Sequence, residues 1–425
     1  MTELNRLGAK DVADLIASRE AGAEEVVKAC IARIEEREPD VGAFQYFDAD
    51  YALEQARTLD NSPSKGVLHG VPLGIKDIID TKDMPTGNGS GIYQGRRPIS
   101  DASCVALSRG AGAIILGKTV TTEFAYFFPG KTRNPHNLSH TTGGSSMGSA
   151  AGAADHMFPI GFGSQTAASV TRPAAYCGTL GYKATTGDFD LQGVCGLAAS
   201  YDTLGFLCRD LEDISLMRQA LIGDRPMPPR ADGAPPRVGF VRTPWWDEAD
   251  AATHHALGWA AEKLAGEGAA ITEPTLPSEF GELIETHKLV MAFDAARARA
   301  YEYVNHPDEL SPQFTALMEE GRAVSYADYR AAQTQSVACR KQVADLMSDV
   351  DVLLAPSAPG EAPEGHAATG DPIFSRMWTL LHVPSVTLPV ATGDSGLPIG
   401  VQIIGKAHGD GALISDARWI YDRLK

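Results

Sequence analysis

Three features are scarce in this sequence: paired cysteines, long apolar runs and positive charge. The six cysteines form no CxxC pair, which in a chain of this size indicates free thiols in a reducing compartment, so we expect a cytoplasmic protein. No stretch approaches the roughly 18 uninterrupted apolar residues of a transmembrane helix, and no apolar segment follows the start as in a signal peptide. Lys and Arg number 37 against 54 Asp and Glu, a net charge of −17, which argues against a nucleic-acid surface.

What is present fits a large globular α/β domain. With 425 residues, of which 44% are hydrophobic, the chain can bury a substantial core. Residues 1–65 show helical periodicity, and residues 66–222 alternate short apolar runs with Gly-rich turns. After a Pro-rich stretch, residues 237–348 are mostly helical and residues 349–425 return to strands. We predict a single large domain with a central mixed β-sheet covered by helices and a variable helical insertion at 237–348.

Several elements can be located more closely. In EEVVKACIARIEEREPD, five apolar side chains share one helical face: Val26, Val27, Cys30, Ile31 and Ile34. The segments VGFVR, DVLLAPSAPG, VPSVTLPV and GLPIGVQIIG are typical of strands, and the last three would complete the sheet late in the chain.

Two segments match well-known sequence motifs, but their neighbouring residues do not favour the local structure that each motif requires. GAIILGKT, residues 112–119, fits a phosphate-binding loop, but its apolar run predicts a buried strand rather than a flexible glycine cradle. GSSMG, residues 144–148, fits a nucleophile elbow around Ser146, but the preceding NLSHTTG is too polar for the buried strand that an elbow requires.

Two Gly/Ser-rich stretches favour binding of an anion or an oxyanion. GGSSMGSAAGAA is typical of a loop that enters an Ala-rich helix, and its small side chains permit close approach to the backbone. In SQTAAS, the successive amides of Thr166, Ala167, Ala168 and Ser169 could be directed at one point, as an oxyanion hole requires. The alternative is that both stretches are only tight packing of helix against sheet.

Lys76 in GVPLGIKDIID follows an apolar strand-like run and is therefore expected to be buried. Desolvation lowers the pKa of a lysine, so this amine is a candidate base near neutral pH. Ion pairing with the adjacent Asp77 or with Asp80 is the alternative.

Together, GVPLGIKD, TTGGSSMGSAA and GFGSQTAASVTRPAAYCGTLGYK resemble the amidase signature family. Further matches are TRNPHN, YDTLGFLCRDLED and GLPIGVQIIG, so the resemblance covers nearly the whole chain and is weakest between about residues 225 and 345. The resemblance implies a Ser-Ser-Lys triad with Lys76 as base, Ser145 as the bridging serine on a cis peptide and Ser169 as nucleophile. It implies an oxyanion hole at Thr166, Ala167, Ala168 and Ser169, and neither a metal nor an organic cofactor.

The sequence departs from the family pattern around the nucleophile. Gln165 stands where the family has an acid, and Ala167 and Ala168 replace glycines, which is tolerated only where φ is negative. The order of Thr171 and Arg172 resembles the compact malonamidase-like branch, in which the arginine helps to bind a substrate carboxylate. An arginine that ties down backbone carbonyls is the alternative.

The residues that we expect around the substrate are Arg172, Gly144, Tyr126, Phe127, Phe128, Trp378 and His382. Malonamate-handling relatives place a second arginine where Phe127 stands, and the aromatic run at 126–128 would instead wall an apolar pocket. We therefore expect an amidohydrolase of a small, partly apolar amide, anilide or carbamate.

Three alternatives remain open at this point. They are a malonamate-type half-amide hydrolase that uses Arg172, the amidase-like subunit of a tRNA-dependent amidotransferase, and a catalytically silent binding protein. The expected partner is a small-molecule amide, without nucleic acid or membrane, and a homodimer is left open.

Overall fold

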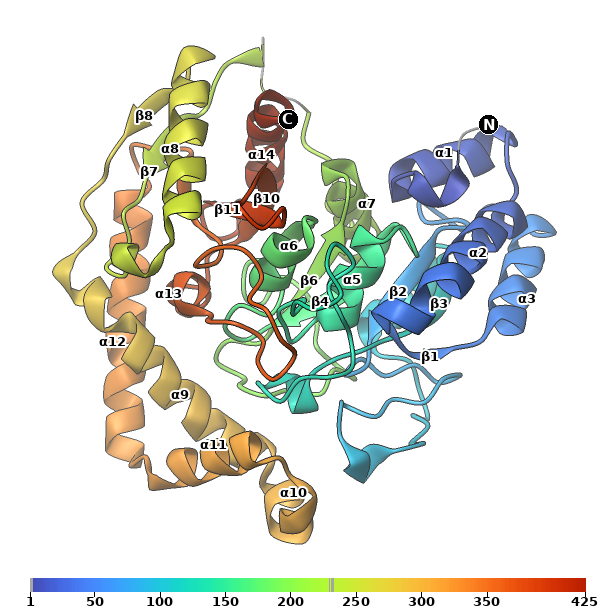
Figure 1. Ribbon diagram of the computed structural model, residues 1–425, viewed down its shortest axis with the longest axis horizontal. Coiled ribbons are helices and arrows are strands. Elements are labelled where there is room, and N and C mark those ends of the chain that lie inside the picture. The colour runs from blue at the N-terminus through green and yellow to red at the C-terminus, as the bar shows by residue number, and fades with distance from the viewer. Residues whose placement is uncertain (1–2, 229, 231–232) are drawn as a thin grey trace.

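A mixed β-sheet crosses the long axis of the molecule and carries helices on both faces (Figure 1). The computed structural model describes residues 3–228, 230 and 233–425. The first two residues of the predicted N-terminal helical region and residues 229, 231 and 232 of the Pro-rich stretch lie outside the described residues.

The sheet has 11 strands in the order β1-β3-β2-β4-β6-β5-β10-β11-β9-β7-β8. Parallel and antiparallel pairs are mixed: β2 is parallel to both β3 and β4, whereas β5 is antiparallel to both β6 and β10. The predicted fold class, a single α/β domain with a central mixed sheet, is confirmed. The strands are β1 Phe44–Phe47, β2 Pro72–Lys76, β3 Ile114–Thr119, β4 Ile160–Gln165, β5 Leu180–Lys183, β6 Thr203–Cys208, β7 Arg237–Phe240, β8 Ala270–Thr272, β9 Val352–Pro356, β10 Ser385–Thr392 and β11 Pro398–Ile404.

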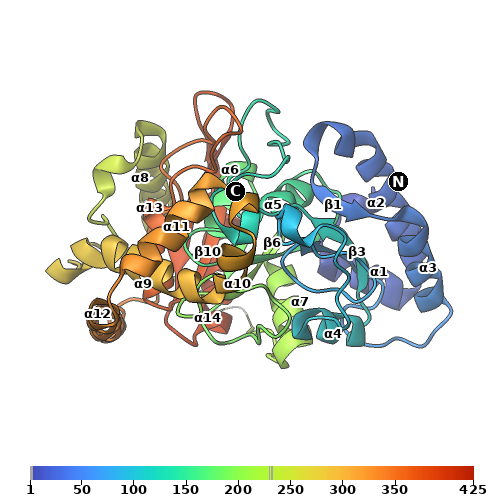
Figure 2. The ribbon, with the colours of Figure 1, turned by 90° about the horizontal axis from the view of Figure 1, so that it is seen from below.

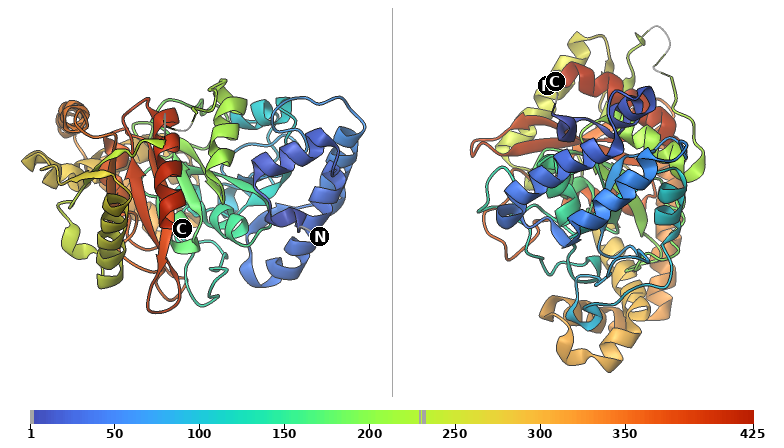
Figure 3. Two further views of the ribbon diagram at one scale, coloured as in Figure 1. Left: turned by 90° about the horizontal axis from the view of Figure 1, so that it is seen from above. Right: turned by 90° about the vertical axis from the view of Figure 1, so that its right-hand side faces the viewer.

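The helices are α1 Ala9–Ser18, α2 Ala23–Val41, α3 Ala49–Asp60, α4 Ser103–Gly110, α5 Met147–Ala154, α6 Thr171–Cys177, α7 Leu211–Ile222, α8 Ala251–Gly266, α9 Leu283–Ala298, α10 Ala300–Asn305, α11 Pro312–Ala323, α12 Tyr326–Leu346, α13 Ile373–Leu380 and α14 Asp410–Leu424. The N-terminal helices, in blue, lie at one end of the long axis, and helices α8, α9 and α12, in yellow and orange, lie towards the other, with α10 nearer the middle (Figures 2 and 3). Helices α5 and α6 lie between these groups, over the middle of the sheet.

The central strands are buried on both faces because side chains alternate along a strand. In β3, Ile114 and Leu116 pack into a core shared with α2, α3, α5 and α6, whereas Ile115 packs into the core on the other face. This is why GAIILGKT is an uninterrupted apolar run. It forms a buried strand, as predicted, and no phosphate-binding loop.

The sequence located several elements correctly and missed others. The predicted helical face of residues 24–40 is the buried face of α2, and the late strands appear as β9, β10 and β11. Residues 1–65 were predicted to be helical, but they also contain β1. This strand forms one edge of the sheet and pairs with β3. The C-terminal α14 was also not expected, because residues 349–425 were described only as strands.

A separate hydrophobic core joins α9, α11, α12 and α13 on the side of the sheet where β4 ends. Phe124 and Tyr201 from the first half of the chain belong to this core. The helical region at 237–348 is therefore packed against the loops that follow the central strands, and it can contribute side chains to them.

Candidate active site

Lys76 is the last residue of β2, a strand that is completely buried between β3 and β4. Its Nζ lies 2.6 Å from Ser145 Oγ and 2.9 Å from Ser164 Oγ. Within the described chain no carboxylate lies within 4 Å of this amine. Asp77, the predicted alternative partner, instead pairs with Lys118 at 3.1 Å.

Burial governs the ionisation of Lys76. Removal from water lowers the pKa of the amine from 10.5 to about 7, and the negative charge of Asp202 offsets only part of this effect. A substantial fraction of Lys76 is therefore neutral at neutral pH, in contact with a hydroxyl group from which it can accept a proton.

Ser145 lies in the glycine-rich loop that precedes α5. The peptide bond between Gly144 and Ser145 is cis, and Gly143 has a φ of +76°. A Cβ on Gly143 would lie 3.0 Å from Pro173 and Tyr176, so both the conformation and the space require glycine. The loop thus packs directly on the first turn of α6 and brings Ser145 Oγ to Lys76.

Ser169 lies in the turn between β4 and α6 and is 8% exposed. Its carbonyl oxygen accepts a hydrogen bond of 3.3 Å from the N–H of Ser146, which joins the two serine loops. Among the described residues no acceptor contacts the four backbone N–H groups from Thr166 to Ser169. The turn therefore presents four consecutive free donors beside the Ser169 hydroxyl.

Gln165 replaces the family acid and makes a different set of contacts. Its Oε1 accepts hydrogen bonds from the N–H groups of Val170 (2.9 Å) and Thr171 (3.0 Å) at the start of α6. Its Nε2 donates to Thr379 Oγ1 at 3.0 Å, and that hydroxyl donates to the carbonyl oxygen of Ala167 at 2.9 Å. Neither Ala167 nor Ala168 has a positive φ, so alanine fits at both positions.

Thr166 is held at its hydroxyl and at its carbonyl. Thr166 Oγ1 donates to Asp202 at 2.5 Å, and Nε2 of His287 lies 2.8 Å from the carbonyl oxygen of Thr166. Nη1 of Arg376 contacts the other ring nitrogen of His287 at 3.1 Å. A carbonyl only accepts and a guanidinium only donates, so His287 is the neutral tautomer with its proton on Nε2.

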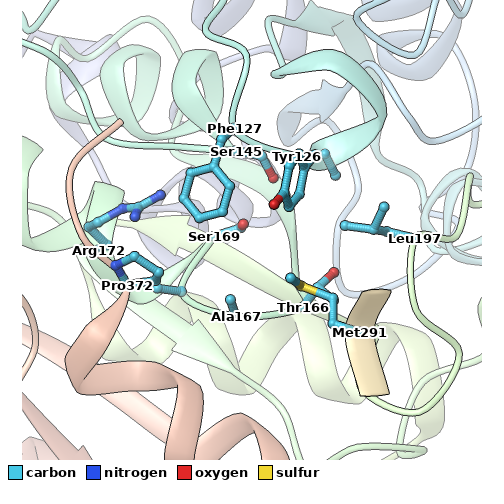
Figure 4. A pocket seen from close by; sticks show the side chains of 12 residues that line it. Tyr126, Phe127, Ser145, Thr166, Ala167, Ser169, Arg172, Leu197, Met291 and Pro372 are labelled. Atoms are coloured by element: carbon cyan, nitrogen blue, oxygen red, sulfur yellow. The ribbon is translucent and has the colours of Figure 1, made fainter. Parts of the chain in front are cut away.

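The Ser169 turn borders a pocket with about 20 Å3 of free space, room for about one water molecule (Figure 4). In Figure 4, Ser169 lies near the middle of the view, Ser145 lies close by between Phe127 and Tyr126, and Arg172 is at the left. The pocket is lined by Ala125, Tyr126, Phe127, Ser145, Thr166, Ala167, Ala168, Ser169, Arg172, Leu197, Met291 and Pro372.

Four residues that we expected near the substrate lie outside this pocket. Phe128 is 44% exposed and points away from the core. Trp378 is buried in the core of α9, α11 and α12, and Nε2 of His382 lies 2.8 Å from the carbonyl oxygen of Ser200. Gly144 packs against Thr369, with its carbonyl oxygen turned to Arg172. Aromatic character alone does not show which of several neighbouring side chains faces a cavity.

Arg172 borders the pocket, and two of its three side-chain hydrogen bonds among the described residues go to the main chain. It is 3% exposed and donates to the carbonyl oxygens of Gly370 and Gly144 and to the Thr369 hydroxyl. This geometry matches the second expectation for Arg172, an arginine that ties down backbone carbonyls.

Sequence reasoning missed Asp202, His287, Thr379 and Arg376. Asp202 lies in YDTLGFLCRDLED, a segment that matched the family, so its motif was a usable signal. His287 and Arg376 come from α9 and α13, and nothing in the sequence links them to residues 165–169. Ser146 is fully buried, and its Oγ contacts the backbone of Ser164 at 3.4 Å, which contradicts the elbow interpretation.

In the part of the chain that the structure describes, His, Cys, Asp and Glu side chains form no group of three that could hold a metal ion. None of the helices in residues 3–228, 230 and 233–425 combines the length and apolar character needed to cross a bilayer.

Residues 25–414 match the protein family called Amidase. The chain is 31% identical to a glutamyl-tRNA(Gln) amidotransferase subunit of Acidothermus cellulolyticus, over 97% of this chain and 93% of that protein. It is 30% identical to the putative amidase AmiD of Mycobacterium tuberculosis, over 97% and 93% of the two chains. A crystal structure of an amidase superposes with a TM-score of 0.91 at 27% identity, covering 99% of this chain and all of the other.

Proposed function

The chain belongs to the amidase signature family, a family of amide hydrolases, and from this we propose that it cleaves a small, partly apolar amide, anilide or carbamate through an acyl-enzyme on Ser169. The observation that supports this most directly is the 2.6 Å contact between Lys76 Nζ and Ser145 Oγ. It joins a buried lysine, which forms no ion pair with any described carboxylate, to a hydroxyl that borders the same pocket as Ser169.

Acylation uses the two serines and the lysine as one proton path. Ser169 Oγ attacks the amide carbonyl carbon and gives its proton to Ser145, whose own proton passes to neutral Lys76. The carbonyl oxygen gains negative charge, and the free N–H groups of residues 166–169 donate to it. When the C–N bond breaks, the proton returns from Lys76 through Ser145 to the leaving nitrogen.

Deacylation follows the same path with water as the nucleophile. Water attacks the ester carbonyl carbon and loses a proton through Ser145 to Lys76, and the proton then returns to Ser169 Oγ as the acid product leaves. Lys76 thus begins and ends each half-reaction as the neutral amine.

The size of the pocket supports a small acyl group. Only about 20 Å3 is free, and the walls that face the serines are mostly apolar: Tyr126, Phe127, Leu197, Met291 and Pro372. A space for about one water molecule holds no acyl group without movement of the walls, and a short acyl group requires less movement than a bulky one.

A half-amide hydrolase that binds its substrate carboxylate with Arg172 is less well supported. The Nη atoms of Arg172 already bond Gly370, Gly144 and Thr369, and the buried Nε has no partner among the described residues. A substrate carboxylate could bind the unpaired Nε–H and the remaining Nη1–H, but a bidentate pair with both Nη atoms would have to replace contacts to Gly370, Gly144 or Thr369.

A second candidate function rests on the similarity to amidotransferase subunits. A protein of this kind would release ammonia from glutamine inside a complex, and the isolated chain would then hydrolyse simple amides poorly. Hydrolysis of simple amides by the purified chain, without glutaminase activity, would contradict this function.

The test of the main proposal is intact-mass analysis after incubation with a serine-directed fluorophosphonate, followed by peptide mapping. We expect one adduct, on Ser169, and labelling slower by at least about 100-fold in Lys76→Ala, because general-base catalysis typically contributes that much or more. Ser146→Ala serves as the matched control and is expected to be labelled.

The remaining outcomes each decide against part of the proposal. An adduct on Ser146 would restore the nucleophile elbow, and no adduct on a folded sample would favour a silent binding protein. Labelling of Lys76→Ala at the wild-type rate would show that Lys76 is not the base that activates Ser169.

A further inference from the structure

A second cavity, of about 400 Å3, lies directly outside the pocket. Phe127 and Pro372 border both spaces, so the Phe127 ring forms part of the wall between them. The remaining lining residues come from α9, from the segment that leads into α13 and from the first turn of α13: Ile284, Lys288, Gly370, Asp371, Ile373 and Arg376.

Arg376 is the residue of this cavity with uncommitted donors. It is 6% exposed, and the one hydrogen bond of its side chain among the described residues is the 3.1 Å contact of Nη1 with neutral His287. No described carboxylate lies within 4 Å of its guanidinium. A guanidinium has five N–H donors, so most of those on Arg376 have no protein acceptor.

The charges at the cavity balance overall, with Arg376 and Lys288 against Asp371 and Glu285. Arg172 and Arg376 lie on opposite sides of the Phe127 ring. The guanidinium carbons of Arg172 and Arg376 lie 5.8 and 5.9 Å from the centre of the Phe127 ring. Lys288 is paired with Glu285 at 2.7 Å, and the Asp371 carboxylate accepts a hydrogen bond of 2.9 Å from the N–H of Ile373. Asp371 is therefore near both arginines but forms an ion pair with neither.

A nearly buried cation without a counter-ion is unfavourable, and a planar carboxylate matches the fork of a guanidinium. We propose that the cavity outside Phe127 is a subsite for a carboxylate on the amide substrate, with Arg376 as the bidentate donor. This proposal rests on the proposed function. The apolar walls at Ile284, Ile373 and Phe127 fit a short hydrocarbon chain between the carboxylate and the amide.

This subsite is distinct from a clamp at Arg172. Arg172 lies on the pocket side of the ring and holds backbone carbonyls, whereas Arg376 lies on the cavity side with free N–H groups. Displacement of the Phe127 ring would connect the two spaces, so that one small substrate can occupy both.

The first test measures binding without catalysis. Glutarate is titrated calorimetrically into Ser169→Ala and into the same protein carrying Arg376→Gln, Arg376→Lys or Arg330→Gln. We expect Arg376→Gln to raise the Kd for glutarate at least about tenfold, Arg376→Lys to raise it less, and the exposed Arg330→Gln to leave it unchanged. Absence of glutarate binding, or equal binding in all four proteins, would overturn the subsite.

The second test compares acids with neutral amides of the same shape. Glutaramate against glutaramide places the carboxylate on the acyl side, and N-acetyl-β-alanine against its carboxamide places it on the amine side. We expect kcat/KM to favour the acid of one pair at least about tenfold, and Arg376→Gln to abolish that preference. Arg376→Gln also removes the contact with His287 and can lower kcat/KM for every substrate. Such a general decrease cancels in the ratio of kcat/KM for the acid to kcat/KM for the neutral amide.

The two proposals can fail separately. Hydrolysis of neutral amides through Ser169 with no preference for either acid would overturn the carboxylate subsite alone. Arg376-dependent glutarate binding in a chain that hydrolyses no amide would support the subsite and contradict the proposed hydrolysis.

Discussion

His287, on helix α9, donates a hydrogen bond of 2.8 Å to the carbonyl oxygen of Thr166. The imidazole is stacked on Tyr201 with ring centres 4.5 Å apart, and burial together with the nearby charge of Arg376 keeps its pKa well below the usual value. A neutral, fixed donor from the least family-like part of the chain thus supports the turn that carries Ser169.

Removal of this donor is expected to slow catalysis more than it weakens binding. We expect His287→Ala to lower kcat about 10- to 100-fold with little change in KM, because the free N–H groups of residues 166–169 would no longer be held in place. His287→Gln, which retains a donor, is expected to recover part of the loss. The exposed His255→Ala is the control, and equal kcat in both alanine variants would contradict the positioning role.

The pH dependence of activity is expected to follow the ionisation of Lys76. In the proposed mechanism the neutral amine is the active form, so kcat/KM should rise with pH and level off above an apparent pKa of about 7. The negative charge of Asp202 raises the pKa of Lys76, so Asp202→Asn should move this rise to lower pH. A profile that is flat between pH 5 and 9 would contradict the assignment of Lys76 as base.

Lys76 is also expected to reduce stability at neutral pH. Its folded-state pKa of about 7 lies below the ordinary 10.5, so between these values the unfolded chain binds a proton that the folded chain does not. The contribution of Lys76 to the free energy of unfolding should therefore be about 3 to 4 kcal/mol lower at pH 7 than at pH 10.

Urea denaturation of wild type and Lys76→Met checks this expectation. The stability of the methionine variant relative to wild type should be greatest at pH 7 and should decrease towards pH 10. A difference that does not vary with pH would show that Lys76 is not neutralised by burial.

Gln165 and Thr379 are expected to act as one unit. Gln165→Glu keeps the acceptor for Val170 and Thr171 but replaces the donor to Thr379 with a second acceptor. The Thr379 hydroxyl can donate to only one group, so the contact with the Ala167 carbonyl is weakened, and we expect kcat to fall about tenfold.

A double-mutant cycle tests this coupling. Thr379→Val should reduce kcat by a similar factor, and the double variant should be little worse than either single variant. If the decrease in kcat of the double variant equals the product of the two single decreases, the two residues act independently.

The sequence predicted the strands that carry the candidate site, and a motif supplied its proposed catalytic residues. β2 and β3 followed from apolar runs, and Lys76, Ser145 and Ser169 were assigned from the family resemblance. Whether Phe127 or Phe128 faces the pocket depends on the path of a loop outside regular structure, and periodicity gives no information there. His287 reaches Thr166 across 121 positions of the chain, a contact that only tertiary packing creates.

The position of β10 beside β5 affects when the protein becomes active during its synthesis. Lys76, Ser145 and Ser169 all leave the ribosome in the first half of translation, whereas Thr379 and β10 emerge about 200 residues later, after roughly 10 to 40 s at ordinary elongation rates. Until then β5 lacks one of its two neighbours, and the Ala167 carbonyl lacks its hydroxyl partner. The nascent chain therefore contains the three proposed catalytic residues before Thr379 and β10 are present to support them. We expect hydrolysis to begin only near the end of translation.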